Sequence, residues 1–295
     1  MTTFKELAEA WIASREHCSG SLGRIRFWVD EFGPLPVESI SEDQVDQAIS
    51  RLVARGKLKG GSGKDRGQPT GQPLSGSTIN RFVSTLAGLF KYARQLRVLP
   101  RSHVPPTRGF EKAPEPVDPD KYFRPEEVER LLAVARIVDR RWKKLPALIV
   151  LGFHTGVRIG NLKELRWEDI DFESKTASIA VTKNGRPHVA PLTDSCIEEL
   201  RKLPKAEPTS LIFKSYRSEK PFNHRALLQK VCKEAGFEGR TFHWLRHGCG
   251  SALANAGVSQ AQIMQVMAHR TLTASARYMH SNVEDRKSVV ERVFK

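Results

Sequence analysis

The feature that most constrains the fold is a proline-rich stretch between two regions of helical hydrophobic periodicity. Residues 100–120 contain six prolines and no apolar period, so neither a helix nor a strand is expected to run through them. A chain of 295 residues is long enough for two domains that each bury a core. We therefore expect a first domain over residues 1–105, a linker over 106–121 and a second domain over 122–295.

The first domain is expected to be helical. Apolar residues recur at helical spacing over Phe4–Ser14 and Thr78–Leu96. Ser41, followed by two acidic residues, is placed to cap a helix that continues through Val53. Residues 56–77 are rich in Gly, Ser, Pro and basic residues, which predicts a mobile loop.

The second domain is expected to be helical with one small antiparallel sheet. Two β-rich runs, Ala177–Val181 and His188–Leu192, flank the dipeptide Asn184–Gly185, which favours a tight hairpin turn. The fold class predicted for the whole chain is therefore mainly α with a small antiparallel β-sheet. Helices are expected from Arg124 onward and over Leu145–Phe153, Cys196–Leu203, Ala226–Ala235, Trp244–Ala256, Ser259–Met267 and Asn282–Phe294.

The charge balance points to a polyanionic partner. The formal net charge is +15, and residues 1–112 carry 17 basic against 11 acidic side chains while residues 113–295 carry 31 against 22. Both parts are therefore basic, by +6 and +9, which favours a chain that grips nucleic acid with both domains. The charge alone does not distinguish this from ribosomal, RNA-binding or anionic-lipid-binding proteins.

Several features indicate a cytoplasmic protein. No apolar run reaches the ~18 residues that a membrane span needs, and Met1–Trp11 is not a secretory signal. The four cysteines, at positions 18, 196, 232 and 249, form no close pair, which is typical of reduced thiols.

Two apparent motifs do not support the chemistry that they resemble. The run from Gly60 to Lys64 lacks the first glycine of a phosphate-binding loop, and Asp65 stands where that loop needs Ser or Thr. His243 and His247 have the spacing of a zinc peptidase, but Trp244 occupies the position of its catalytic Glu. An NTPase and a zinc hydrolase are both disfavoured.

The residues that remain form an ordered polar set. Taken singly, each is more typical of a solvated charge or a packed side chain; their joint order makes them candidates for catalysis. The set comprises Arg158, Lys183, His243, Arg246, His269 and Tyr278.

This set resembles the signature of the tyrosine recombinases, the phage integrase family. The matching motifs are His154-Thr-Gly-Val-Arg158, Lys183 in a hairpin, His243-Trp-Leu-Arg246-His247 and Met267-Ala-His269, followed by Tyr278. The resemblance covers residues 122–280 and, more loosely, 4–100. It implies an N-terminal helical core-binding (SAM-like) domain and a C-terminal α+β catalytic domain of the DNA breaking-rejoining type. One departure is Asn161, where the family usually carries an acid.

The resemblance also implies a mechanism. Tyr278 would be the nucleophile and His243 the group that takes its proton, while Lys183 would protonate the leaving 5′-oxygen. Arg158 and Arg246 would fork hydrogen bonds to the phosphate, to which His269 would add another. The covalent 3′-phosphotyrosine stores the broken bond, so no metal, ATP or other cofactor is expected.

The expected function is site-specific recombination or integration of DNA. The implied partners are double-stranded DNA and an accessory directionality factor. The protein is expected to be a monomer or a weak oligomer when free and to form a homotetramer on synapsed DNA. A bacterial or phage-encoded, nucleoid-associated, cytoplasmic enzyme fits this picture. Two alternatives stay open: a type IB topoisomerase that relaxes DNA, and a non-catalytic excision or architectural factor. The apolar stripe of the C-terminal helix is expected to dock on a neighbouring protomer, or else on its own domain.

Overall fold

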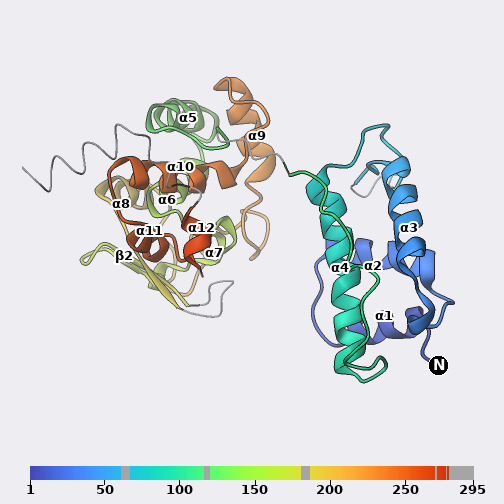
Figure 1. Cartoon of the computed structure of the whole chain (residues 1–295). Helices are drawn as coiled ribbons and strands as arrows, with labels where there is room; N and C mark the ends of the chain where they lie inside the picture. The colour runs from blue at the N-terminus through green and yellow to red at the C-terminus, as the bar shows by residue number, and fades with distance from the viewer. Residues whose placement is uncertain (61–66, 116–119, 181–186, 270, 277, 279–295) are drawn as a thin grey trace, which may run out of the picture. The chain divides into compact units, whose positions relative to one another are not determined.

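The structure is a computed structural model of the chain, and it describes residues 1–295 except 61–66, 116–119, 181–186, 270, 277 and 279–295. The chain divides into two compact units, Met1–Val117 and Asp118–Lys295. We call them the first and the second unit and describe each by itself (Figure 1).

The described part of the first unit is helical, as predicted. Its elements are α1 (Phe4–Ala13), α2 (Ser19–Phe32), the 3-10 turn η1 (Val37–Ser39), α3 (Glu42–Arg55) and α4 (Gly76–Gln95). The predicted cap is confirmed, because the Ser41 hydroxyl accepts from the amide of Gln44 at 3.3 Å and the Gln44 side chain accepts from the amide of Ser41 at 2.8 Å. The sequence analysis did not identify α2, whose buried residues all lie at Ile25 or beyond.

Aromatic side chains form the core of the first unit. Trp28 is fully buried, and its indole nitrogen donates to the carbonyl of Phe82 on α4 at 2.9 Å. The Trp28 ring stacks on Phe32, which meets Phe4 edge to face. Burial of such rings stabilises a fold by about 1.5–3 kcal/mol each, so these contacts hold α1 and α4 onto α2.

Two segments expected to be loop or linker carry backbone contacts. In the described flanks of the 56–77 loop, the amide of Lys57 donates to the carbonyl of Gln72 at 2.8 Å. In the proline-rich stretch, buried Asn80 of α4 exchanges hydrogen bonds of 2.9 Å with both backbone groups of Ala113, and it donates to Glu115 at 2.6 Å. The chain up to Glu115 is therefore fastened to α4.

The second unit contains most of the described elements. They are α5 (Pro125–Val138), α6 (Lys144–Thr155), α7 (Ile159–Glu164), the 3-10 turn η2 (Trp167–Asp169), β1 (Ile170–Asp171), β2 (Thr176–Ile179), β3 (His188–Pro191), α8 (Asp194–Arg201), α9 (Arg225–Glu234), α10 (Phe242–Asn255), α11 (Gln260–Val266) and α12 (Leu272–Ala276). Helix α6 is buried along most of its length and packs against α5, α8 and α10 (Figure 1). Over the described ranges, no helix has both the length and the apolar character to cross a membrane.

The strands of the described residues form one antiparallel sheet in the order β1-β2-β3. Ala177 pairs with both Ile170 and Ala190, and Ile179 pairs with His188. The predicted fold class, mainly α with a small antiparallel β-sheet, is confirmed. The two-residue β1 was not predicted, because a strand this short has no readable alternation. The predicted Asn184–Gly185 turn lies outside the described residues, as does Lys183.

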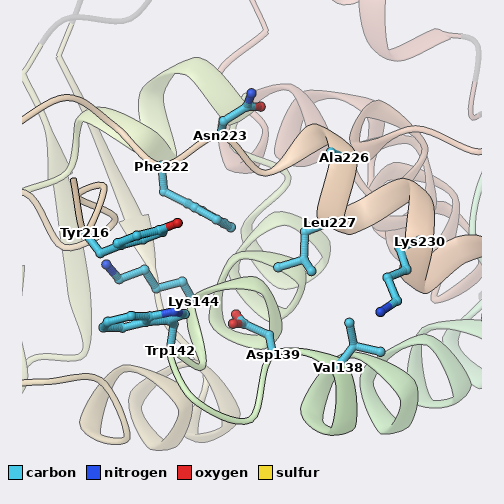
Figure 2. Close-up of a pocket in the computed structure, with 10 residues that line it drawn as sticks. All are labelled: Val138, Asp139, Trp142, Lys144, Tyr216, Phe222, Asn223, Ala226, Leu227 and Lys230. Carbon is cyan, nitrogen blue, oxygen red and sulfur yellow. The ribbon is translucent and has the colours of Figure 1, made fainter. Parts of the chain in front are cut away.

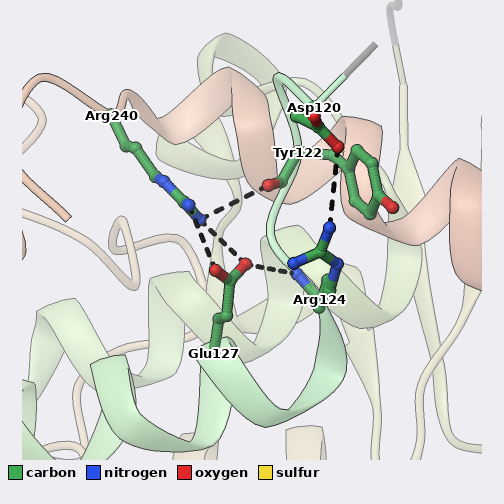
Figure 3. Close-up of polar contacts among 5 residues, drawn as sticks. All are labelled: Asp120, Tyr122, Arg124, Glu127 and Arg240. Atoms are coloured by element: carbon green, nitrogen blue, oxygen red, sulfur yellow. Dashed lines mark hydrogen bonds and ion pairs between the residues drawn. The ribbon is translucent and has the colours of Figure 1, made fainter.

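A polar clamp fixes the start of the second unit against α10 (Figure 3). Arg240 makes a two-pronged ion pair with Glu127 of α5, with N–O distances of 2.8 and 3.1 Å. The same carboxylate accepts from the amide of Arg124 at 2.9 Å. The Arg240 guanidinium also lies over the rings of Phe123, Phe237 and Trp244. This clamp holds the start of the helix that carries two candidate site residues, His243 and Arg246.

Candidate active site

Arg158 is placed by the turn that ends α6. The helix stops at Thr155, and Gly156 takes a left-handed conformation (φ 60°) that favours glycine. The carbonyl of Gly156 accepts a hydrogen bond from Nη1 of Arg246 on α10. Arg158, two residues after Gly156, is the N-cap residue of α7. One short turn therefore sets the positions of both predicted catalytic arginines.

A small cavity joins these two arginines, and we call it the arginine cavity. It measures about 10 Å³, room for about one oxygen-sized atom. Arg246 is almost completely buried beside it, with 3% of its surface exposed. Guanidinium groups can donate several N–H hydrogen bonds to one phosphate, so two arginines that line one small space are suited to bind an anion. The lining residues are Val157, Arg158, Asn161, Ile179, His188, Arg246, Met267 and Ala268.

Tyr278 is buried, with 8% of its surface exposed, and packs against Ile263 and Met267. Its hydroxyl lies 3.0 Å from Nδ1 of His247. The ring occupies space left by Gly250 of α10, where an added Cβ would lie only 2.5 Å from Cε2 of the tyrosine. The hydroxyl of Tyr278 is thus held beside an imidazole that can exchange its proton.

His269 lies just past the end of α11, as predicted, and faces the tyrosine. Its Nδ1 is 2.6 Å from the hydroxyl of Ser275, a fully buried residue of α12. The His269 and Tyr278 rings are nearly parallel, with centroids 6.2 Å apart. The sequence analysis missed Ser275, because α12 is too short to show a helical period.

His243 is exposed on the first turn of α10, and its ring contacts that of His247 with centroids 4.5 Å apart. The hydrogen bond to Tyr278 in this structure is made by His247, which the sequence analysis quoted in a motif without giving it a role. The i, i+4 spacing of the two histidines in the sequence is the signal that could have predicted this ring contact. Among the described residues, no group of three or more His, Cys, Asp or Glu is placed to hold a metal ion.

Five of the six predicted site residues lie in the described structure, and they form two adjoining groups. Arg158 and Arg246 line the arginine cavity. The second group consists of His243, His269 and Tyr278. His269 contacts Tyr278 directly, and His247 connects His243 to Tyr278. Met267 lines the cavity and also packs on the tyrosine, so the two groups are neighbours. The sixth residue, Lys183, is outside the described residues. The cavity also includes His188, which the sequence analysis did not select.

The buried cysteines of the second unit are poorly suited to act as competing nucleophiles. Burial raises the pKa of Cys232 to about 11 and that of Cys249 to about 12, and it raises the pKa of Cys196 as well. A thiol with such a pKa stays protonated at neutral pH, so little thiolate is present. These three thiols are therefore poorer candidates for the nucleophile than Tyr278.

A more open pocket of about 450 Å³ lies elsewhere in the second unit (Figure 2). Trp142 and Tyr216, which both line it, stack with ring centroids 5.2 Å apart and planes 8° from parallel. None of the ten residues drawn there belongs to the predicted catalytic set. This pocket is therefore separate from the arginine cavity.

Comparisons with known proteins place the chain in a family. The model of the phage integrase family matches residues 121–285, more than half of the chain. The integrase of Salmonella phage P22 is 23% identical over 94% of this chain and 76% of its own length. The fimbrial regulatory protein FimE of Escherichia coli K12 is 31% identical over 46% of this chain and 73% of its own.

Solved structures show the same fold. The Tn1549 transposon integrase in complex with transposon right-end DNA superposes with a TM-score of 0.73 at 18% identity, covering all of both chains. A lambda integrase dimer bound to a core site gives a TM-score of 0.70 at 19% identity, covering 96% of this chain and 95% of that one. The family match and the shared fold lead to one conclusion: this chain belongs to the phage integrase family of tyrosine recombinases, enzymes that break and rejoin DNA.

Proposed function

We propose that the protein is a site-specific recombinase that cuts DNA with the hydroxyl of Tyr278. The tyrosine oxygen bonds to the scissile phosphorus, the bond from phosphorus to the 5′-oxygen breaks, and a 3′-phosphotyrosine and a free 5′-hydroxyl result. A 5′-hydroxyl from another strand then attacks the phosphotyrosine. The bond from phosphorus to the tyrosine oxygen breaks, and a phosphodiester joins the two strands. The observation that carries the proposal is the Tyr278 hydroxyl, held 3.0 Å from His247 and next to the arginine cavity.

The arginines supply the electrostatic part of the reaction. Charge grows on the non-bridging phosphate oxygens as the tyrosine attacks, and preorganised cations stabilise that charge most effectively in a buried site. Arg246 is buried and donates to the Gly156 carbonyl, while Arg158 lines the same cavity. Asn161 lines the same cavity and offers a neutral amide where the family usually has an acid.

Proton transfer is assigned to histidines and a lysine. A tyrosine hydroxyl is a weak nucleophile at its free pKa of ~10, so its proton must leave during attack. His247 is placed to accept it, and exposed His243, in ring contact with His247, is the second candidate. Lys183 is proposed to protonate the leaving 5′-oxygen. His269, oriented by Ser275, is proposed to donate to the phosphate.

The two units are proposed to share DNA binding. Residues 1–105 would act as the core-binding domain and residues 122–295 as the catalytic domain, joined by the segment 106–121. Both parts are basic, and phosphate contacts account for most of the affinity of such proteins. We further propose a homotetramer on two synapsed duplexes, a monomer or weak oligomer in free solution, an accessory directionality factor and a cytoplasmic, nucleoid-associated location.

A product assay tests the function. A DNA site is first selected by gel shift from a random-sequence duplex library, and two copies are then cloned into one supercoiled plasmid. A recombinase exchanges or inverts the segment between the copies, which new restriction fragments report. Relaxation of the same plasmid without exchange would instead show a topoisomerase, and binding without any change in the DNA would show a passive factor.

A further inference from the structure

Ser275 is a buried polar residue that lies between two of the proposed catalytic side chains. It belongs to the short helix α12, and 0% of its surface is exposed. Its hydroxyl oxygen lies 2.6 Å from Nδ1 of His269. Its backbone carbonyl accepts a hydrogen bond from the amide of Tyr278 at 3.1 Å. One residue therefore contacts His269 through its side chain and Tyr278 through its backbone.

The backbone of His269 is fixed by the way in which α11 ends. The amide of His269 donates to the carbonyl of Met264 at 2.9 Å, and the amide of Ala268 donates to the carbonyl of Gln265 at 3.2 Å. Ala268 takes the left-handed conformation, with φ 49°, that such a helix ending requires. Met267 and Ala268 also line the arginine cavity. His269 therefore follows directly after two residues of the cavity wall, and its contact with α12 sets the orientation of the ring.

The hydrogen bonds of Ser275 determine which nitrogen of His269 carries the proton. Among the described residues, Nδ1 of His269 is the one hydrogen-bond partner of the Ser275 hydroxyl. A buried O–H group without an acceptor costs more free energy than an oxygen with an unused lone pair. The hydroxyl therefore donates to Nδ1, which must be unprotonated to accept. The proton of the neutral imidazole is then on Nε2.

This position of the proton suits a group that binds phosphate. The non-bridging oxygens of a phosphodiester are acceptors, so a side chain that binds them must donate. An imidazole with its proton on Nε2 presents an N–H group at the tip of the ring. The other tautomer would present a lone pair there, which repels an anion.

We propose that Ser275 is a positioning residue: its hydroxyl holds the His269 ring by Nδ1 and keeps the proton on Nε2, the nitrogen that donates to the scissile phosphate. The inference rests on the proposed function, because it concerns the histidine that we assign to the phosphate. Ser275 itself touches no DNA in this scheme.

Four variants separate the hydroxyl from simple packing. Ser275→Ala removes the hydroxyl and keeps the Cβ, whereas Ser275→Thr keeps the hydroxyl. Thr273→Ala is the matched control, because it removes a hydroxyl from an exposed residue of the same helix. His269→Ala, alone and combined with Ser275→Ala, tests whether Ser275 acts through His269. Urea denaturation shows which variants are folded.

The readout is the single-turnover rate of covalent complex formation at saturating selected duplex, together with the Kd from gel shift. Ser275→Ala should lose on the order of tenfold in rate at an unchanged Kd, Ser275→Thr should stay within about threefold of wild type, and Thr273→Ala should match wild type. In the His269→Ala background, Ser275→Ala should change the rate by less than about twofold, because the hydroxyl has lost its target. A wild-type rate for Ser275→Ala, or an equally large loss in the His269→Ala background, would overturn the proposal.

A second measurement uses the wild-type protein, so it does not depend on how any variant folds. NMR of nitrogen-labelled imidazoles, at a pH above the ordinary imidazole pKa of ~6.5, should show His269 protonated at Nε2 and unprotonated at Nδ1. The opposite tautomer, or an equal mixture of the two, refutes the proposal even if the enzyme is fully active. If the wild-type protein forms no covalent complex while the tautomer is as expected, the proposed function fails and the hold of Ser275 on His269 stands.

Discussion

Replacing Gly250 with alanine should disable the nucleophile without removing a single polar group. The new Cβ would lie 2.5 Å from Cε2 of Tyr278, 2.6 Å from its Cζ and 2.8 Å from its Cδ2. Ordinary carbon contacts lie at ~3.5–4.0 Å, so the ring must retreat by about 1 Å. That shift moves the hydroxyl away from His247, now 3.0 Å distant. Misplacement by about 1 Å costs on the order of 100-fold in rate.

Stability should change much less than the rate does. Alanine is better than glycine in a helix by up to ~1 kcal/mol, and an extra methyl in a packed site costs ~1–3 kcal/mol. The two effects oppose each other, so we expect the free energy of unfolding to fall by about 0–2 kcal/mol. A folded Gly250→Ala protein is therefore available for kinetic measurement.

The assay compares covalent-complex formation with binding on the selected duplex. Gly250→Ala should retain the wild-type Kd within about threefold and lose about 100-fold in the single-turnover cleavage rate. Gly23→Ala is the matched control, since it adds the same methyl to a helical glycine whose Cβ would meet no atom within 4 Å. Cleavage by Gly250→Ala at the wild-type rate would refute the claim that this packing positions the tyrosine.

Three further predictions concern the leaving group, the clamp formed by Arg240 and Glu127, and the C-terminal residues 287–295. Lys183→Ala should block cleavage of ordinary DNA, and a sulfur in the 5′-bridging position should restore it, because a thiolate leaves without protonation. Glu127→Gln should lower the free energy of unfolding at neutral pH by about 1–3 kcal/mol in urea denaturation. Burial alone would raise the pKa of Glu127, but hydrogen bonds from Arg240 and Arg124 lower it below its usual value. The stabilisation of the folded protein by ionised Glu127 should therefore vanish as the pH falls through that lowered pKa. Deletion of residues 287–295 should preserve single-site binding in gel shifts and reduce synapsis and recombination.

Each of these predictions has an outcome that contradicts it. Sulfur rescue of Arg158→Ala in place of Lys183→Ala would mean that the general acid is misassigned. A Glu127→Gln deficit that persists at acid pH would show that the clamp does not act through charge. Loss of solubility or of single-site binding on truncation would place residues 287–295 in the core of their own domain.

The parts of the fold that were predictable are those with a long local signal. Helices such as α4 and α10 showed their apolar period directly, and Ser41 identified the start of α3. Helix α7 has only six residues and β1 only two, so neither shows a period that can be read. Helix α2 opens with two glycines among serines, which hides its apolar second half.

The candidate site divides in a similar way. Arg158 and Tyr278 could be selected because they stand in motifs that resemble those of the tyrosine recombinases. Ser275, His188 and the hydrogen bond between His247 and Tyr278 depend on tertiary placement, because the groups around them lie in other elements. A serine or histidine of this kind has no local pattern that marks it in one sequence.

The central claim is that Tyr278 forms the covalent bond to DNA, and one measurement tests it directly. Wild-type protein and Tyr278→Phe are each incubated with the labelled selected duplex, quenched with detergent and separated by denaturing electrophoresis, with Kd values measured in parallel. The account predicts a detergent-resistant complex for the wild type, whose DNA-linked peptide contains Tyr278, and none for Tyr278→Phe at an equal Kd. A covalent complex formed by Tyr278→Phe, or a wild-type linkage at another residue, would contradict it.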